Sequence, residues 1–237
     1  MTMTVAQRWR AKILAQQQLQ AREALESTPQ NLGVIDQDLH FDIEQLRDIE
    51  RIDQRAERKR DVLLPKWLPQ VENYIQSGES YPFLPLVYCM VWLIDTGEFE
   101  HGIDLAEVAV AQGQKMPENF DNSPGAFIAD NLRDWVELEY RQGHSVEPFF
   151  TRIFTLITEK WQLHEELTAR WYVLAARLAL RGADGKETAP SMISNVDTLE
   201  KAAALLAKAD EVCPKKSGTK TLTNKIASRL RALTRIN

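Results

Sequence analysis

Residue types that could hydrolyse a phosphodiester bond occur in this sequence, but their spacing does not form a site. A nuclease holds two or three carboxylates around a divalent metal ion, often with a lysine nearby. The pairs with suitable types are Glu137 with Glu139 and Glu57 with Lys59. Residues two apart on a helix point about 200° away from each other, and no strand–turn–strand pattern is visible that would bring ligands together. We therefore predict no catalytic residue and no metal site.

Other signatures of catalysis are also missing. The four histidines are isolated in the sequence: His40, His101, His144 and His164. His164, Glu165 and Glu166 lack the second histidine of a zinc-protease helix. There is no phosphate-binding glycine loop followed by lysine and no Gly-x-Ser-x-Gly elbow. By motif, the chain is not an enzyme and needs no cofactor.

Basic residues are concentrated at the two ends of the chain. The whole chain has a net charge of −5, but residues 1–213 alone carry about −12. The segment from Pro214 to Asn237 supplies the difference, because it contains seven cations and no acid. Its seven cations are Lys215, Lys216, Lys220, Lys225, Arg229, Arg231 and Arg235. The first cations, Arg8, Arg10, Lys12 and Arg22, precede the first acid, Glu23. Both ends predict binding to a polyanion. The alternative for the tail is that it aids solubility or pairs with the acidic body.

A third group of cations lies in the middle of a predicted helix. Arg47, Arg51 and Arg55 follow at four-residue steps, with Lys59 one step further. Acids are interleaved with them: Glu44, Asp48, Asp53 and Glu57. The row is therefore either a DNA-binding face or a solvated face whose charges compensate each other. Together the candidate DNA-binding residues are Arg8, Arg10, Lys12, Arg47, Arg51, Arg55, Lys59, Lys215, Lys216, Lys220, Lys225, Arg229 and Arg231.

Helices must position these charges, since strand signals are nearly absent. The apolar row spaced three or four apart is Leu39, Ile43, Leu46, Ile49, Ile52 and Ala56. It predicts one helix from Asp38 to Leu64, about 40 Å long and ended by Pro65. A helix of this length needs another helix along it, from this chain or from a neighbouring subunit.

The remaining sequence predicts a series of shorter helices. Their ranges are Thr4 to Glu26, Trp67 to Gln76, Leu84 to Ile94, His101 to Gln112, Pro124 to Gln142, Pro148 to Leu180 and Val196 to Val212. Glycines stand where C-terminal caps are expected: Gly78, Gly97, Gly113 and Gly143. The segments Ser27 to Asp36 and Arg181 to Asn195 are predicted linkers. The predicted fold class is all-α, with a long N-terminal helix followed by a multi-helix bundle and a basic C-terminal tail.

Four regions follow from this pattern. They are a basic N-terminal helix and linker (1–35), the long amphipathic helix (36–64), a helical core and oligomerisation domain (65–182), and a linker, helix and basic tail (183–237). Six aromatic residues lie among aliphatics and are predicted to pack in the core: Trp67, Trp92, Trp135, Trp161, Trp171 and Tyr172. Trp9, between two arginines, is instead a candidate for stacking on a nucleic-acid base.

The composition is that of a globular protein, with 44% hydrophobic and 27% charged residues. No apolar run reaches the roughly 20 residues that cross a bilayer, and the longest, Phe83 to Ile94, contains Pro85. The first ten residues lack the apolar core of a signal peptide. We therefore predict a cytosolic protein with no membrane partner, in which Cys89 and Cys213 are reduced thiols.

Three segments, in a fixed order, resemble the small terminase subunit family of peduovirus-type temperate phages. They are Lys59 to Pro69, Met90 to Gly97, and Met116 with Pro117. The opening residues Val5 to Arg8 are also similar to the start of this family. The resemblance extends from about Asp38 to Asp134, and beyond Arg141 only the helical pattern and the basic tail are shared.

The resemblance implies a role in viral DNA packaging. The small subunit of such a terminase recognises the cohesive-end (cos) site of concatemeric DNA and delivers it to the large ATPase–nuclease subunit, which docks on the portal. The implied partners are double-stranded viral DNA, the large subunit, the portal and further copies of the chain in a ring. The implied place is the cytoplasm of the host bacterium during virion assembly, and a bacterial genome could encode the chain within a prophage.

Members of this family are often described as the endonuclease subunit of the terminase, although no nuclease site is visible in this sequence. Three hypotheses follow. The chain is a DNA-binding ring that directs cleavage by the large subunit, or it is itself the metal-dependent cos endonuclease, or it is a helical adaptor whose tail binds the large subunit or the portal.

Overall fold

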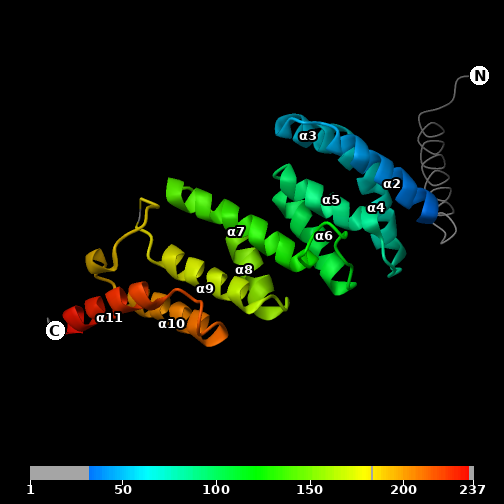
Figure 1. The fold of residues 1–237 in the computed structure, drawn as a ribbon. Coiled ribbons are helices and arrows are strands. Elements are labelled where there is room, and N and C mark those ends of the chain that lie inside the picture. The colour runs from blue at the N-terminus through cyan, green and yellow to red at the C-terminus, as the bar shows by residue number, and fades with distance from the viewer. Residues whose placement is uncertain (1–31, 183, 235–237) are drawn as a thin grey trace, which may run out of the picture. The chain divides into compact units, whose positions relative to one another are not determined.

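The computed structural model describes residues 32–182 and 184–234 (Figure 1). They belong to two compact units, one ending at Val108 and the other beginning at Ala109. This boundary falls inside the segment 65–182 that was predicted as one core. Every named element of the described residues is a helix, and the one β feature among them is an isolated bridge between Arg181 and Glu187. The predicted all-α fold class is confirmed.

The first unit is built around one buried helix. Its elements are α2 (Leu32–Arg47), α3 (Ile52–Arg58), the π-helix η2 (Lys59–Leu63), α4 (Leu64–Ser77), α5 (Leu84–Asp95) and α6 (Phe99–Ala111), the last of which crosses the unit boundary. Every residue of α5 from Pro85 to Ile94 is buried, and α5 packs against α2, α4 and η2. Gly102 of α6 lies so close to α5 that a Cβ there would stand 2.7 Å from Cδ1 of Ile94.

The second unit is a stack of helices around α9. Its elements are α7 (Pro124–Gln142), α8 (Phe149–Glu159), α9 (Glu165–Ala179), the short 3₁₀-helix η3 (Pro190–Met192), α10 (Val196–Val212) and α11 (Lys220–Thr234). α9 packs against α7, α8 and α10, and α10 packs in turn against α11 (Figure 1). The core between the last three helices contains Ala176, Leu180, Leu199, Ala202, Leu206 and Ile226.

The prediction of a single helix from Asp38 to Leu64 is wrong. α2 ends at Arg47, and α3 begins only at Ile52. Ile52, a member of the predicted apolar row, is 82% exposed, so the row meets the core only as far as Leu46. The guanidinium of Arg55 donates to the carbonyl oxygens of Arg47 and Ile49, and these hydrogen bonds satisfy carbonyls left free where α2 ends. The predicted linker is also wrong at its end, because α2 already begins at Leu32.

Pro65 does not end the helix, contrary to the sequence prediction. The chain remains helical from Ile52 to Ser77, and Pro65 lies just after the π-helical turn of η2. There the backbone N–H of Leu64 donates to the carbonyl of Lys59, five residues earlier. A proline normally collides with the carbonyl four residues before it and lacks an N–H for that carbonyl. The wider π turn changes this hydrogen-bond register and so accommodates the ring.

Two further segments differ from their predictions. The predicted helix from Pro148 to Leu180 is divided into α8 and α9, because Nδ1 of His164 accepts a hydrogen bond from the backbone N–H of Glu166 and caps a new helix. The basic tail contains a helix that was not predicted, α11, and its Ile226 is 1% exposed. The Thr4 to Glu26 helix lies outside the described residues.

Other sequence predictions are confirmed. The four predicted capping glycines have positive φ angles: Gly78 (70°), Gly97 (83°), Gly113 (66°) and Gly143 (79°), a region that glycine enters without the Cβ penalty. Four of the six aromatics predicted in the core are buried, Trp67, Trp92, Trp161 and Trp171, and Trp135 and Tyr172 are partly buried.

The two cysteines are free thiols and both are buried. Burial raises the pKa of the Cys89 thiol. Among the helices of the described residues, none combines the length and apolar character that a membrane crossing requires.

Candidate nucleic-acid interface

The predicted arginine row does not form one continuous face. Arg47 is the last residue of α2, Arg51 precedes α3, and Arg55 lies within α3. Arg55 donates through Nη2 to the carbonyl oxygen of Arg47 at 3.1 Å. Arg51 pairs with Asp53 at the surface, and its hydrogen bond holds the pKa of that carboxyl below the usual value. Most of the row is therefore engaged in contacts within the protein.

Lys59 has a structural role in the first unit. Its Nζ lies 2.6 Å from Oδ2 of Asp95 and joins η2 to α5, and its side chain is only 16% exposed. Arg58 beside it donates to the side chain of Gln45 at 2.5 Å. Within the described part of the chain, the exposed cations here without an ion pair are Arg47 and Arg60. Three of the four cations of the predicted row, Arg51, Arg55 and Lys59, are thus engaged within the protein, which favours a structural role over a free DNA-binding face.

We expect Arg55→Ala to lower the free energy of unfolding by about 1–2 kcal/mol, because the carbonyls at the end of α2 lose a charged donor. Arg60→Ala is the matched control, since it removes one exposed cation from the same region and should stay within about 0.5 kcal/mol of the parent. Urea unfolding followed by circular dichroism measures both. Equal losses in the two variants would contradict a capping role for Arg55.

The segment before α11 uses its polar groups to hold itself in place. Nζ of Lys216 lies 2.7 Å from Oε1 of Glu166. The hydroxyls of Ser217 and Thr219 both donate to Oδ1 of Asp210, the latter at 2.6 Å. These hydrogen bonds lower the pKa of Asp210. The start of the basic segment is therefore ordered by two acids that precede it in the sequence.

α11 packs one face on the second unit and exposes the other. Its packed side includes Ile226 and the partly buried Leu222, Leu230 and Leu233. Arg229, predicted to bind DNA, lies toward this side, where its Nε donates to the carbonyl of Ile193 at 2.8 Å. The exposed residues are Lys220, Thr221, Asn224, Lys225, Ala227, Ser228, Arg231, Ala232 and Thr234. No exposed position of this helix carries an acid.

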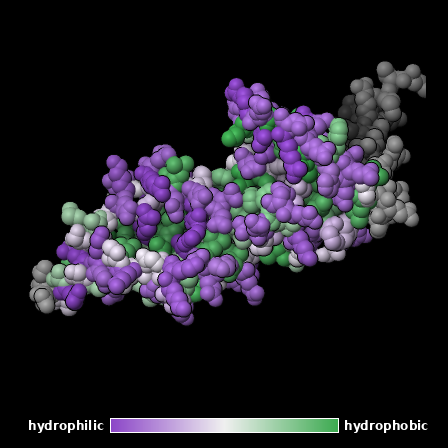
Figure 2. Space-filling view, in the orientation of Figure 1, coloured by the Kyte–Doolittle hydropathy of each residue, from purple (hydrophilic) through white to green (hydrophobic). Residues whose placement is uncertain are grey.

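Several predicted cations are available on this surface. Lys215, Lys220, Lys225 and Arg231 are exposed, and none of them forms an ion pair with a described residue. Among the residues that the structure describes, Nε of Arg231 donates to the carbonyl of Ala227 in its own helix and to no other group. Figure 2 shows that hydrophilic side chains cover most of the visible face of the molecule, with hydrophobic residues scattered between them.

Three uncharged polar residues were missed by the sequence prediction, which counted only charges in the tail. Thr221, Asn224 and Ser228 are exposed on α11 among the lysines and arginine. The helical spacing of Leu222, Ile226, Leu230 and Leu233 was the signal that would have placed them on one outward face. The predicted contacts Arg8, Arg10 and Lys12, and also Trp9, lie outside the described residues.

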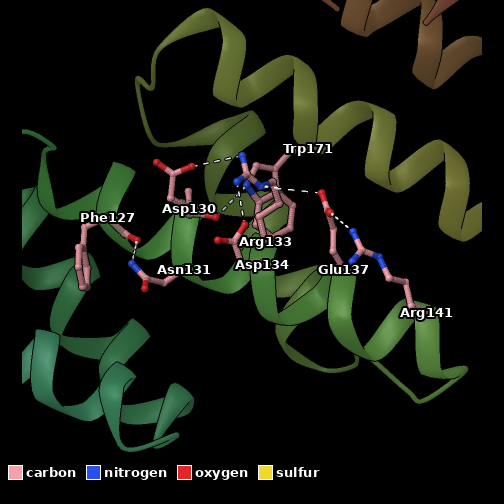
Figure 3. A network of polar contacts seen from close by, with 9 residues as sticks. Phe127, Asp130, Asn131, Arg133, Asp134, Glu137, Arg141 and Trp171 are labelled. Carbon is pink, nitrogen blue, oxygen red and sulfur yellow. Dashed lines mark hydrogen bonds and ion pairs between the residues drawn. The ribbon is translucent and has the colours of Figure 1, made fainter. Parts of the chain in front are cut away.

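Two of the three carboxylates considered for nuclease chemistry have partners within the protein, and the third, Glu57, is exposed. On α7, Glu137 pairs with Arg141 at 3.3 Å and approaches Arg133, which also contacts Asp130 and Asp134 (Figure 3). Glu139 does not contact this network, and its Oε2 lies 2.7 Å from Nδ1 of His144, within hydrogen-bond distance. In the described ranges, no group of three or more His, Cys, Asp or Glu residues is placed to hold a metal ion.

The segments that carried the family resemblance are mainly parts of the core. Leu63, Leu64 and Trp67 of the first segment are buried. The two lysines of that segment form ion pairs, Lys59 with Asp95 and Lys66 with Asp42. The second segment, Met90 to Gly97, covers the end of α5 and its glycine cap. These residues define the architecture of the first unit.

Comparison with known proteins gives the class to which this helical chain belongs. Residues 37–166 match the family model of the phage small terminase subunit, which is more than half of the chain, so the chain belongs to this family. The chain is 37% identical over 201 residues to the "Probable terminase, endonuclease subunit" of Haemophilus phage HP1 (strain HP1c1), covering 85% of this chain and 71% of that protein. The resemblance found in the sequence is confirmed.

A second relative is more distant. The "Terminase, endonuclease subunit" of Escherichia phage P2 is 26% identical over 133 residues, which is 55% of this chain and 52% of the relative. No solved structure matches the chain.

Proposed function

We propose that this chain is the DNA-binding small subunit of a phage terminase, which binds the cos site of concatemeric viral DNA and directs cleavage and packaging by the large subunit. The observation that carries this proposal is the cationic, acid-free surface of α11 and the segment before it, in a chain of the phage small terminase family. DNA phosphates attract such a surface and release their counterions on binding.

The proposal includes a homo-oligomeric ring in the host cytoplasm, with the large subunit and the portal as partners. Support for an oligomer comes from apolar side chains on the surface of the first unit, where Val34, Phe41 and Ile52 are 58%, 59% and 82% exposed. Contact with a neighbouring copy would remove these side chains from water. The single helix predicted from Asp38 to Leu64, which could have packed along a neighbouring subunit, is divided after Arg47. The support for a ring is therefore this exposed apolar surface and the family.

Retardation of a cos-containing DNA fragment by the full-length chain tests the DNA-binding part. If Lys215, Lys220 and Lys225 each neutralise one phosphate, the logarithm of the affinity falls with the logarithm of salt concentration at a slope of about −2.7. Changing these three residues to glutamine should remove most of that slope, whereas Arg47→Gln with Arg60→Gln should leave it nearly unchanged. Light scattering should give a mass far above the 27.1 kDa of one chain. A monomer indifferent to DNA would contradict the proposal.

The second candidate function is cleavage by the chain itself. It is favoured by the names of the two relatives, both described as terminase endonuclease subunits. Nicking of cos DNA by the purified chain with magnesium, lost on substitution of one carboxylate, would establish it. Under our proposal the chain alone leaves the DNA intact, and cleavage needs the large subunit.

A further inference from the structure

The exposed face of α11 has an ordered arrangement of side-chain types. Asn224, Ser228 and Arg231 follow at steps of four and three residues, so they form a strip along one side of the helix. The opposite side is fixed to the core by Ile226 and its apolar neighbours. The strip therefore lies along the middle of the exposed face, and Lys225 lies at its edge.

The size of α11 suits the major groove of B-form DNA. Its 15 residues span about 22 Å at 1.5 Å per residue, and the major groove, about 12 Å wide, admits one α-helix. Ala227 and Ala232 are exposed beside the strip, and their short side chains do not hold the helix away from a groove floor. Arg229 and Ile226 anchor the helix from behind, so the face is presented on a fixed support.

The strip carries groups that distinguish base pairs. An asparagine amide bonds to N6 and N7 of adenine, an arginine guanidinium bonds to O6 and N7 of guanine, and a serine hydroxyl bonds to several base edges. Such groups read sequence, whereas lysines that contact phosphates only position the protein. Asn224 and Arg231 occupy the middle of the face, and the lysines lie at its edge and at its start. The groups that can read bases are thus central and the groups that can contact phosphates are peripheral, as recognition in a groove requires.

The charge of the helix points to an anionic partner outside the chain. The first turn of α11 contains no acid and begins with Lys220, although a helix N-terminus disfavours a cation. The exposed face has no acid that could form a compensating pair along the helix. The phosphates of a nucleic acid would supply the favourable electrostatic contacts that the exposed cations of α11 do not make within the helix. A protein partner would need an acidic groove of matching shape, and it would leave the asparagine–serine–arginine strip without a role.

We propose that α11 is a recognition helix that enters the DNA major groove, where Asn224 and Arg231 read base edges while Lys220 and Lys225 contact phosphates. This inference rests on the proposed DNA-binding function and deepens it, because it assigns the reading of the cos site to the C-terminal helix. Phosphate contacts alone could not supply that selectivity.

The test compares the affinity of the full-length chain for two duplexes of equal length, one carrying the cos region and one with the same bases in scrambled order. Asn224→Ala and Arg231→Ala should each reduce the ratio of the two affinities by about tenfold. Asn224→Ala should leave binding to the scrambled duplex unchanged. Lys225→Gln should weaken both duplexes equally and reduce the salt slope by about one. Asn119→Ala, which removes an exposed asparagine from the loop before α7, is the matched control and should change nothing.

A second measurement locates the contact. Methylation of guanine N7, which lies in the major groove, should interfere with binding at a guanine for the parent chain and not for Arg231→Ala. Circular dichroism should confirm that each variant is folded, as expected for substitutions at exposed positions.

The outcomes separate this inference from the proposed function. If the parent discriminates the duplexes and both alanine variants retain its full ratio, α11 is not the reader and the DNA-binding function stands. Loss of large-subunit ATPase stimulation with unchanged DNA selectivity would make α11 a protein-docking surface and overturn the inference. A parent that binds both duplexes equally also overturns it, and a parent that binds neither overturns the proposed function as well.

Discussion

Trp171→Ala is expected to lower the free energy of unfolding by about 3–5 kcal/mol. The side chain of Trp171 is 0% exposed, and its Nε1 donates to the carbonyl of Ala129 at 3.2 Å, which joins α9 to α7. Its ring also stacks on Phe150 of α8, with centroids 5.8 Å apart. One substitution therefore leaves a large cavity where three helices meet and removes the donor to a buried carbonyl.

Denaturant unfolding followed by far-UV circular dichroism measures this loss. Met192→Ala is the matched control, because Met192 is 77% exposed and its truncation should cost less than about 0.5 kcal/mol. The effect should also reach DNA binding, since α9 carries α10, and α10 carries α11. At denaturant concentrations near its unfolding transition, the variant should bind cos DNA more weakly than the parent does, although every cation of α11 is unchanged. If Trp171→Ala lowers the free energy of unfolding no more than Met192→Ala does, Trp171 does not hold the three helices together.

Local signals in the sequence were sufficient to predict several elements closely. α7 runs from Pro124 to Gln142 and α10 from Val196 to Val212, as predicted. Each begins after a residue whose side chain caps the helix, Ser123 or Asn195, and α7 ends at Gly143. Where a capping residue or a glycine in the left-handed conformation marks a boundary, the sequence contains the physical cause of that boundary.

The break between α2 and α3 could not be predicted in this way. No glycine or proline lies between Arg47 and Ile52, and the apolar spacing continues across the break. The stabilising contact comes from Arg55, which lies in the next helix and satisfies the carbonyls behind it. The opposite error occurred at Pro65, where a strong stop signal was overcome by a π-helical turn. Both outcomes depend on contacts that residue spacing does not encode.

At the candidate nucleic-acid interface too, residue spacing predicts some features, whereas others depend on contacts between distant segments. The sequence predicts which residues are cationic, but not which of them are already engaged. Lys59 reaches Asp95, 36 residues away, and Arg229 reaches Ile193, also 36 residues away. Such partners are set by the packing of helices. The available cations and the polar strip between them could be separated from the structural ones only once α11 had been placed against α10.

Asp42→Ala is expected to lower the free energy of unfolding by about 2–3 kcal/mol. Asp42 lies on α2 and is 6% exposed. Its Oδ2 accepts hydrogen bonds from Nζ of Lys66 at 2.6 Å and from Nε1 of Trp67 at 2.8 Å, both on α4. Removing the carboxylate leaves the N–H of a buried tryptophan without an acceptor, at a cost of about 1–3 kcal/mol. The ion pair adds less, because the Lys66 side chain is 41% exposed and turns to water.

Two further substitutions separate the hydrogen bond from the charge. Asp42→Asn keeps an acceptor for Trp67 and loses only the charge opposite Lys66, so its cost should be about 1 kcal/mol. Asp53→Ala removes a carboxylate from an exposed ion pair in the same unit and should cost the least of the three, because water screens such a pair. Urea unfolding should rank the three variants in that order. If Asp42→Ala and Asp53→Ala cost the same, the tie between α2 and α4 does not depend on the buried carboxylate, and apolar packing alone holds α2 on the first unit.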